Sequence, residues 1–345
     1  MSDSKLRRIC LTPRVSGLGG MVSFQAKLRA GLAARGIEIT QDLDDEPYDA
    51  VLVIGGTRRL LALRRAQQRG VPVVQRLDGI NWLHRRRWTG PRHWLRAEIA
   101  NWILATIRKR LASHIVYQSE FVRDWWDQRY GPAPVAYSVI HNGVDLKLFT
   151  PEGPEQPPEK HFHLLLVEGR LDGGYELGLD SAVALAQQLR ENYAFKVELS
   201  VAGRVSERLR ARWDRRAGIP IHWRGELPND AIPALNRSAH LLYSADINAA
   251  CPNAVIEALA CGLPVVAFDT GALGELVNPD CARLANYGGD PWRLEQPDMA
   301  ALTKAAAKAL AEQESLRVGA RARAEAAFSL DAMVEAYLRA LGAEG

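Results

Sequence analysis

The sequence lacks long apolar runs. No stretch of about 18 consecutive apolar residues occurs, although a helix that crosses a bilayer needs roughly that many. We therefore expect no transmembrane helix. The first residues, MSDSKLRRICLTP, also lack the apolar core of a secretory signal, which predicts a cytoplasmic protein.

Cysteine is scarce and shows no pairing pattern. Cysteines stand at positions 10, 251, 261 and 281, a spacing that indicates neither a disulfide framework nor a metal site. The eight histidines show no metal-ligand spacing. An Asp-x-Asp at 42–44 lies in the acidic loop QDLDDEPYD, and we interpret it as a chance occurrence. The sequence thus predicts no metal site, with a catalytic thiol as the alternative to buried or loop cysteines.

Positive charge is confined mainly to one segment. The net charge is +4, but residues 82–111 hold eight Lys and Arg against one acid, Glu98, together with four of the nine tryptophans. Arginine is attracted to anionic surfaces and tryptophan prefers the headgroup level of a bilayer. The segment predicts either an anionic membrane surface as a partner or tryptophans packed on the sheet with arginines in water. No recognised nucleic-acid module accompanies it, so we expect no nucleic-acid partner.

Apolar strand-like runs alternate with helical periodicity along the chain. Examples are RRICLT, YDAVLVIGG and VPVVQRLDG in the first half, and FHLLLVEGR, KVELSVAGR and LPVVAFDTG in the second. Continuous apolar strands separated by helices are typical of parallel sheets that are covered on both faces. The pattern predicts an α/β protein built from two similar halves.

A proline-rich stretch separates these halves. TPEGPEQPPEKH, residues 150–161, has four prolines and no apolar periodicity, which indicates a linker. We predict a first domain over 1–152 and a second over 160–327, with a cleft between them near the linker. The C-terminal helix, 328–345, is expected to cross back onto the first domain.

Three glycine loops follow predicted strands. They are RVSGLGGMVSF (14–24), VEGRLDGGYE (167–176) and DTGALGEL (269–276). Glycine permits positive φ and close approach to a ligand, and the start of a helix favours an anion. The loops therefore indicate phosphate binding, with simple tight turns as the alternative for each.

Glu257 is the one carboxylate in an apolar helical stretch, NAVIEALACG. An isolated helix glutamate is ordinarily solvated. The neighbours of Glu257 are expected to be buried, however, and its side chain to point at a loop. A carboxylate so placed can accept two hydrogen bonds from a vicinal diol such as ribose.

The stretch PNAVIEALACGLPVVAFDTGALGELV, residues 252–277, resembles the signature of family 4 glycosyltransferases, which have the GT-B fold. Further similar segments follow the family's order along the chain: GLGGMVSF, VYQSEFVRDWW, SVIHNGVDLKLF, VEGRL, VAGR with HWRGEL, and FSLDAMVEAYL. The resemblance covers nearly the whole chain. It implies two Rossmann-like parallel-sheet domains that face each other across a cleft.

The resemblance also implies a reaction: retaining transfer of a sugar from a UDP-, GDP- or ADP-sugar to a hydroxyl of a glycan or lipid-linked acceptor, without a metal or another cofactor. Glu257 would hold the donor ribose, and Arg170 would contact the leaving phosphates. The remaining donor contacts would come from amides of Gly19 and Gly20 and from amides of Gly271, Ala272 and Leu273, with Glu275 bracing the last loop. Cell-wall, lipid-linked or polysaccharide assembly would be the setting, in the cytoplasm or on the cytoplasmic membrane face.

Three positions depart from the family pattern. The family usually has a second glutamate eight positions before Glu257, where this chain has Ala249; Asp246, helped by amides of Cys251 and Asn253, is the candidate replacement. A lysine normally follows the arginine, but GRLDGGYELGLDS has none. Gly174 or Tyr175 stands there, and Arg204 or Arg224 is the candidate second cation.

The third departure concerns a His-Asp pair in the first domain. QRLDGIN keeps Asp78 but has Leu77 in place of the histidine. Arg76 and Asp78 are then the polar groups expected on the acceptor side. These losses leave two alternatives open beside an active transferase: a weakened protein that binds nucleotide sugars without transfer, and a sugar-nucleotide epimerase of the same fold.

Overall fold

The computed structural model describes residues 6–17, 19–88, 90–172 and 176–342. The chain divides into two compact units, and each is described by itself. The first unit comprises Met1–Gly143 together with Leu330–Gly345, and the second comprises Val144–Ser329. Within the described ranges, no helix is both long and apolar enough to cross a membrane.

The described residues of the first unit form a six-stranded parallel sheet in the order β2-β1-β3-β4-β5-β6. Its strands are β1 (Arg8–Thr12), β2 (Glu38–Thr40), β3 (Ala50–Ile54), β4 (Val73–Leu77), β5 (His114–Tyr117) and β6 (Tyr137–Val139). Its helices are α1 (Gly20–Ala33), α2 (Leu60–Gln68), η1 (Leu83–Arg85), α3 (Pro91–Arg110), α4 (Glu120–Tyr130) and α12 (Leu330–Leu341).

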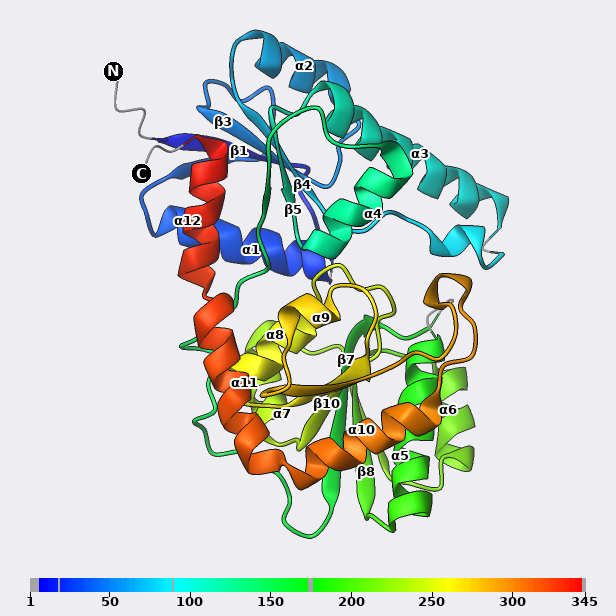
Figure 1. The fold of residues 1–345 in the computed structure, drawn as a ribbon. Helices are drawn as coiled ribbons and strands as arrows, with labels where there is room; N and C mark the ends of the chain where they lie inside the picture. The colour runs from blue at the N-terminus through cyan, green and yellow to red at the C-terminus, as the bar shows by residue number, and fades with distance from the viewer. Residues whose placement is uncertain (1–5, 18, 89, 173–175, 343–345) are drawn as a thin grey trace. The chain divides into compact units, whose positions relative to one another are not determined.

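Helices cover both faces of this sheet (Figure 1). Successive side chains of a strand point to opposite faces, so Leu52 of β3 packs in a cluster with residues of α1 and α12, whereas Val53 packs in a second cluster with residues of α2 and α3. All residues of β3 are buried, as its continuous apolar pattern predicted, and β4 also buries the polar side chains of Gln75 and Arg76.

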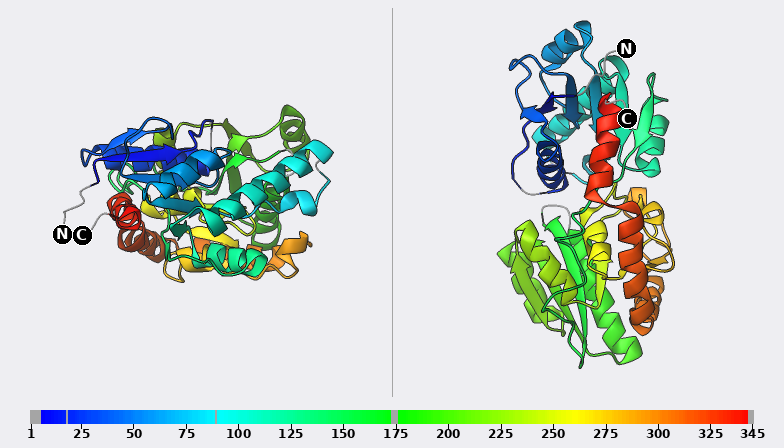
Figure 2. Two further views of the ribbon diagram at one scale, coloured as in Figure 1. Left: turned by 90° about the horizontal axis from the view of Figure 1, so that it is seen from above. Right: turned by 90° about the vertical axis from the view of Figure 1, so that its left-hand side faces the viewer.

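The C-terminal helix α12 packs against α1 (Figure 2). Gly31 of α1 allows the contact, because a Cβ there would lie 2.5 Å from Cγ2 of Val334. The rings of Phe24 and Tyr337 also meet, with centroids 5.2 Å apart. The last helix of the chain is thus part of the first unit's core.

The second unit repeats this architecture, with its described residues in a six-stranded parallel sheet of order β12-β11-β10-β7-β8-β9. Its strands are β7 (Phe162–Arg170), β8 (Val197–Arg204), β9 (Ile221–Gly225), β10 (Leu241–Ser244), β11 (Val265–Phe268) and β12 (Ala282–Ala285). Its helices are α5 (Glu176–Tyr193), α6 (Glu207–Arg216), η2 (Asn229–Ala231), α7 (Ile232–Arg237), α8 (Asn253–Ala260), α9 (Leu273–Leu276), η3 (Pro291–Arg293), α10 (Met299–Ala311) and α11 (Gln313–Ala327).

The boundary between the units differs from the predicted one. The chain passes from the first unit to the second after Gly143, so residues 144–152 belong to the second unit. Val144 donates its N–H to the carbonyl of Phe328 at 2.8 Å. The Arg321 guanidinium of α11 donates to the carbonyls of Leu146 (3.2 Å) and Phe149 (2.8 Å). These bonds fix the segment to helices that sequence periodicity alone could not connect with it.

The proline-rich stretch 150–161 is consequently not the connection between the units. It lies within the second unit, where Arg237 of α7 donates to the Glu155 carboxylate at 2.6 and 3.0 Å and to the Thr150 carbonyl at 3.3 Å. Gly153 packs directly on the same guanidinium. The predicted linker is therefore a docked loop, held by an arginine about eighty residues further along the chain.

Candidate functional site

Two arginines lie side by side where β7 and β8 of the second unit end. Arg170 and Arg204 are partners in the β7–β8 ladder, and Leu171 donates its N–H to the Arg204 carbonyl at 2.9 Å. The Arg170 side chain is 56% exposed, and its Nε donates to Asp172 at 2.6 Å. The register thus brings together the two cations that the sequence offered for a diphosphate. Neighbouring guanidinium groups with exposed N–H donors suit phosphate oxygens.

A basic groove of about 670 Å³ begins at Arg170. Two acids, Asp172 and Glu176, lie on its wall. The guanidinium groups on its wall belong to Arg170, Arg208, Arg212, Arg215 and Arg216. Positive charge exceeds negative charge there, so the groove attracts anions to the edge of the sheet that bears Arg170.

A glycine holds the ends of these two strands together. Gly203 has φ +134°, and a Cβ at this position would lie 1.9 Å from the carbonyl oxygen of Glu168. No other residue type fits without moving β7. Gly203 is the glycine of the VAGR motif, and the close approach of the β7 backbone explains why a glycine stands there.

Glu168 and Asp246 form a pair of carboxylates at the same edge, and sequence reasoning missed Glu168. β7 and β10 are adjacent strands, with Glu168 near the end of β7 and Asp246 two residues after β10. Burial and the negative charge of Asp246 raise the pKa of Glu168, while a hydrogen bond from the backbone of Ala245 opposes the shift. The surrounding protein reduces the hydration of the Asp246 carboxylate and so raises its pKa as well. Part of the residue is nevertheless exposed to solvent. The available signal was a glutamate in VEGR, close behind the apolar run that forms the buried part of β7.

Glu257 lies in the middle of α8 rather than in its first turn. It is the fifth residue of this helix and is only 5% exposed. Its neighbours Val255, Ile256, Ala258 and Leu259 are buried, as predicted. A solvated surface carboxylate is thereby ruled out, and buried glutamates are uncommon unless they have polar partners. Asn253 opens α8 and is half-buried.

The loop that lacks the second acid is packed against the third glycine loop. Ala249 is 2% exposed, and its carbonyl accepts the Ala272 N–H at 2.9 Å. A Cβ on Gly271, whose φ is +63°, would lie 2.5 Å from the Ala249 nitrogen. The neighbouring Asn248 has φ +57°, and its buried Nδ2 has no hydrogen-bond partner among the described residues.

This packing changes what the third glycine loop can offer a ligand. Two of its three predicted amides are already used, because Ala272 donates to Ala249 and Leu273 donates to the Thr270 carbonyl at 3.4 Å. The prediction that all three amides face a donor is corrected accordingly: the contact with the loop before α8 uses one amide and the turn itself uses another. For Gly271, no bond from its amide is seen within the described residues.

The brace of this loop comes from α11. Arg323 donates from Nη2 to the Glu275 carbonyl at 2.7 Å and from Nε to the Leu276 carbonyl at 2.9 Å. These carbonyls end the short helix α9 and have no helical partners of their own. Sequence reasoning missed Arg323, which is nearly fifty residues away, and bracing by the Glu275 side chain stays a prediction.

In the first unit, the glycine loop opens α1. Gly17 and Gly19 have φ +96° and +129°, and the Gly19 carbonyl accepts the N–H groups of Val22 and Ser23 at 3.1 Å. Among the described residues, apart from the chain neighbours of each glycine, no atom lies within 4 Å of a Cβ built at Gly17 or Gly19. Positive φ therefore explains these glycines. Gly20 is exposed as the first residue of a 14-residue helix, where amide groups favour an anion.

The end of β4 carries the polar groups predicted for the acceptor side. Arg76 is 1% exposed, lies 3.8 Å from the Phe24 ring centroid, and donates to Asn142 Oδ1 at 3.0 Å. Its Nε and Nη1 have no partner among the described residues. Burial raises the pKa of Asp78, and the Arg76 charge opposes this shift. Leu77 is fully buried in place of the family's histidine.

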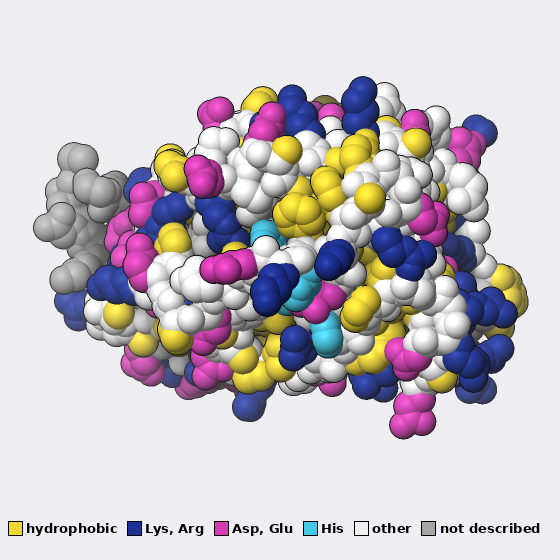
Figure 3. All heavy atoms as spheres, turned by 90° about the horizontal axis from the view of Figure 1, so that it is seen from below, with side chains coloured by type: hydrophobic (Ala, Val, Ile, Leu, Met, Phe, Trp, Pro, Cys, Tyr) yellow, Lys and Arg dark blue, Asp and Glu magenta, His cyan; other side chains and the backbone are white. Residues whose placement is uncertain are grey.

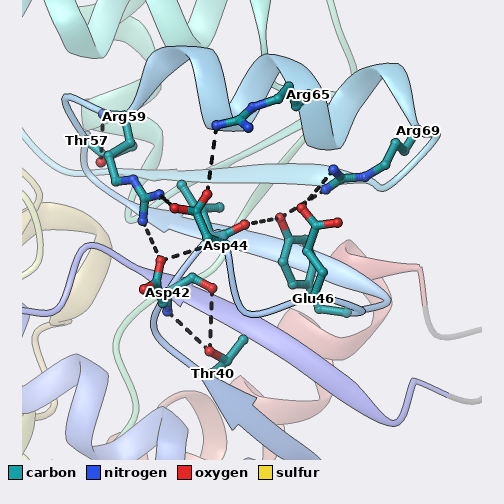
Figure 4. A network of polar contacts seen from close by, with 10 residues as sticks. Thr40, Asp42, Asp44, Glu46, Thr57, Arg59, Arg65 and Arg69 are labelled. Carbon is teal, nitrogen blue, oxygen red and sulfur yellow. Dashed lines mark hydrogen bonds and ion pairs between the residues drawn. The ribbon is translucent and has the colours of Figure 1, made fainter.

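The structure does not place the other residues considered from the sequence beside the polar groups described above. Arg224 donates to Ser200 Oγ at 3.3 Å, and Gly174 and Tyr175 lie outside the described residues. The Asp-x-Asp carboxylates bind arginines, with Asp42 and Asp44 both on Arg59 (Figure 4). Within the described ranges, no group of His, Cys, Asp and Glu side chains is suited to hold a metal ion.

Four histidines nevertheless gather at the opposite end of β7 and β8, a grouping that linear spacing did not reveal. Glu198 lies 3.1 Å from His161, 3.0 Å from His222 and 3.8 Å from His163. The backbone N–H of His163 in turn donates to Nδ1 of His240 at 3.0 Å. Histidine side chains among acids and arginines are visible in Figure 3. The β7–β8 register, which pairs His163 with Glu198, produces the cluster.

Two family models match the chain. The model described as Glycosyltransferase Family 4 matches residues 24–148, and the model described as Glycosyl transferases group 1 matches residues 163–312. The chain belongs to glycosyltransferase family 4. The family predicted from the signature around Glu257 is thus confirmed.

A curated relative agrees with this family. It is a GDP-mannose-dependent alpha-(1-6)-phosphatidylinositol dimannoside mannosyltransferase of Mycobacterium tuberculosis (strain ATCC 25177 / H37Ra), 30% identical over 181 residues. The match covers 50% of this family 4 chain and 45% of the relative. The chain therefore matches less than half of that relative's length.

Solved structures confirm the predicted GT-B fold. A sucrose-phosphate synthase from Thermosynechococcus elongatus superimposes with a TM-score of 0.74 at 16% identity, over 98% of this chain and all of the other. HepE of Anabaena, in complex with UDP-glucose, gives a TM-score of 0.70 at 18% identity, over 99% and 100% of the two chains. The two six-stranded sheets and their helices belong to this two-domain α/β fold.

Proposed function

We propose that this family 4 chain transfers a sugar from a nucleoside-diphosphate sugar to an acceptor hydroxyl, with retention of configuration at the anomeric carbon. The observation that carries the proposal is the arrangement in the second unit. A buried glutamate lies in α8, the helix that follows β10, and two ladder-paired arginines end β7 and β8 of the same sheet. Family membership and the basic groove beside Arg170 support the same conclusion.

Each group has a proposed role that fits its chemistry. Glu257 accepts hydrogen bonds from the two ribose hydroxyls, as a carboxylate with two oxygens can. Arg170 and Arg204 donate to the diphosphate, where negative charge grows as the sugar leaves. Gly271 and Asn253 supply backbone amides. In the first unit, the exposed backbone at Gly19 and Gly20 offers the same amide chemistry to a phosphate.

The proposed step needs no separate enzymatic base. The acceptor oxygen forms a bond to the anomeric carbon, the bond from that carbon to the diphosphate breaks, and the acceptor proton passes to the departing phosphate oxygen. Fixed guanidinium donors stabilise the charge of the leaving group, which is the role a metal ion has in other enzymes. Asp78 is proposed to orient the acceptor hydroxyl.

The relatives suggest which substrates to try first. The mycobacterial relative is named for GDP-mannose and a phosphatidylinositol dimannoside, and HepE was solved with UDP-glucose. A binding panel should therefore include GDP-mannose, UDP-glucose and ADP-glucose. A lipid-linked acceptor and a soluble glycan acceptor should be tested with each donor that binds.

Glu257→Gln tests the ribose assignment. We expect the variant to bind its nucleoside diphosphate about tenfold or more weakly, because a charge-assisted hydrogen bond contributes roughly 1.5–3 kcal/mol. For the 2′,3′-dideoxy nucleotide, which lacks both ribose hydroxyls, the variant and the wild type should bind with equal affinity. Titration calorimetry measures both. An equal loss with ribo- and dideoxy-nucleotides would show that Glu257 does not hold the ribose.

A binding protein without transferase activity is the second candidate. Ala249, buried where a carboxylate would otherwise stand, favours it. Release of nucleoside diphosphate in the presence of acceptor separates the candidates. Transfer requires release together with a glycosylated product, whereas donor binding without release would establish the binding protein. Conversion of the donor to another sugar without any acceptor would instead indicate the epimerase.

A further inference from the structure

The start of α3 and the loop before it expose an unusual set of large apolar side chains. Three of the four tryptophans of this segment are exposed, so the interpretation that they pack on the sheet is wrong for these three. The exposed fractions are 83% for Trp88, 44% for Trp94, 55% for Leu95, 43% for Ile99 and 61% for Trp102. Contiguous exposed apolar groups of this kind mark interaction surfaces.

Helix geometry places part of this set on one stripe. Leu95, Ile99 and Trp102 follow an i, i+4, i+7 spacing, which puts them on the same face of α3. The first six residues of α3, 91–96, are all exposed. In Figure 1 the cyan start of α3 and the preceding loop extend beyond the strands of the first unit's sheet. This end of the helix is thus a projecting surface that carries both large apolar and charged side chains.

The projecting part is held in a defined shape. Arg85 donates to both oxygens of Glu98, at 2.6 and 2.8 Å, and His84 Nε2 lies 2.8 Å from the same carboxylate. Asn81 and Asn101 exchange three hydrogen bonds of 2.9–3.0 Å. The loop 81–86 is therefore fixed on α3, and the exposed tryptophans do not belong to a freely moving tail.

The charge around the stripe is of one sign. Arg86, Arg92 and Arg96 are exposed beside it. Glu98 is the single acid of residues 82–111, and the bonds from Arg85 and His84 neutralise it; its pKa is lowered to about 2 chiefly by Arg85. The face thus combines tryptophan and aliphatic side chains with unopposed cations. That combination is complementary to an anionic lipid surface, where tryptophan lies at headgroup level and arginine binds lipid phosphates.

We propose that the first half of α3, with the loop at Trp88, docks the first unit on an anionic membrane surface. The stripe of Leu95, Ile99 and Trp102 enters the headgroup region, and Arg92 and Arg96 bind lipid phosphates. This inference concerns the first unit alone and does not depend on the proposed donor site. If both hold, the enzyme meets a lipid-linked acceptor at the surface on which it is docked.

Co-sedimentation with vesicles tests the proposal. The full chain is mixed with vesicles of phosphatidylcholine alone or of phosphatidylcholine with about one third phosphatidylglycerol. We expect binding to the anionic vesicles only. Trp88→Ala/Trp102→Ala should weaken it about tenfold or more. Arg92→Gln/Arg96→Gln should weaken it about fivefold for each charge removed, and added salt should weaken the wild type similarly.

Matched variants on the same unit act as controls. Leu61 of α2 is 77% exposed, so Leu61→Ala removes an equally exposed apolar side chain. Arg58→Gln/Arg64→Gln removes two exposed charges away from α3. Both controls should bind vesicles like the wild type. Thermal shifts with nucleoside diphosphates should be the same in all variants, which separates failure of this proposal from failure of the donor site.

Three outcomes would overturn membrane docking. One is equal binding to neutral and anionic vesicles, and another is unchanged binding by the Trp88/Trp102 variant. The third is a lipid-free dimer in light scattering that Trp102→Ala abolishes, because a second copy of the chain would then cover this face.

Discussion

Gly271 lies against the backbone of Ala249, so closely that a Cβ would stand 2.5 Å from the Ala249 nitrogen and 2.6 Å from its oxygen. The contact joins the loop before α8 to the loop before α9. It also buries the position at which the family usually has a glutamate. Close packing of the two loops thus requires a glycine at position 271 and leaves Ala249 buried.

Gly271→Ala should therefore destabilise the folded state of the second unit. Alanine is strained at φ +63° and would also collide with backbone atoms that cannot rotate away. We expect a loss of more than about 1 kcal/mol in unfolding free energy and weaker binding of nucleoside diphosphates. Gly70→Ala is the control, because its φ is +81° and its surroundings are open. Equal melting temperatures for the two variants would contradict the contact.

Arg170→Ala tests the phosphate role. The exposed ion pair with Asp172 contributes little to stability, so the melting temperature should hardly change. Affinity for a nucleoside diphosphate should fall about tenfold or more, whereas affinity for the nucleoside should not. Arg293→Ala, which removes an exposed arginine paired with Asp290 in the same unit, should leave both affinities unchanged. An equal loss for nucleoside and diphosphate would refute the assignment.

Glu168→Gln should change how stability depends on pH. The pKa of Glu168 is raised above its ordinary value of 4.5 by burial and by Asp246. The folded state therefore keeps this proton while the unfolded state loses it, so the wild type loses stability as the pH rises above 4.5. Glutamine does not titrate. The difference in melting temperature between the Glu168→Gln variant and the wild type should therefore increase with pH, by a few degrees, in favour of the variant.

Differential scanning fluorimetry between pH 4.5 and 9 measures this difference. Glu314→Gln removes an exposed acid of α11, and the pH dependence of its melting temperature should match that of the wild type. If the Glu168 variant also had the wild-type pH dependence, the carboxylate pair would not be coupled to folding.

Arg237→Ala should release the proline-rich stretch. Its guanidinium holds Glu155 and Thr150 and supports Gly153, so residues 150–161 should be cut several times faster by a protease of low specificity. Mass spectrometry of timed digests locates the cuts. Arg64→Ala, an exposed arginine of the first unit, should digest like the wild type. Unchanged cleavage would mean that other contacts hold the loop.

Several features could be predicted from local pattern. The buried strand β3 was visible as a continuous apolar run, since a strand covered on both faces needs no polar side. The helix around Glu257 was recognised by its apolar neighbours and by the family signature. Positive φ at Gly19 and Gly271 agrees with glycine loops at strand ends. These properties depend on residues that are close in the chain.

Other features depend on strand order and register. Glu168 meets Asp246 because β7 lies beside β10, which follows it by about seventy residues. The exposure of Trp88 and Trp102 depends on where α3 leaves the sheet. The docking of residues 150–161 depends on Arg237. Helical and strand periodicities carry no information about such distant partners.

The amino-acid sequence by itself indicated the family through its resemblance to the family signature. It also determined the two parallel-sheet units and the presence of glycines where the backbone turns, because periodicity and backbone sterics act locally. Only the tertiary structure decided which amides of the third glycine loop are used internally, which carboxylates share an edge, and which tryptophans reach solvent. Those outcomes follow from packing between segments far apart in the chain, where each contact is set by the register of the whole sheet.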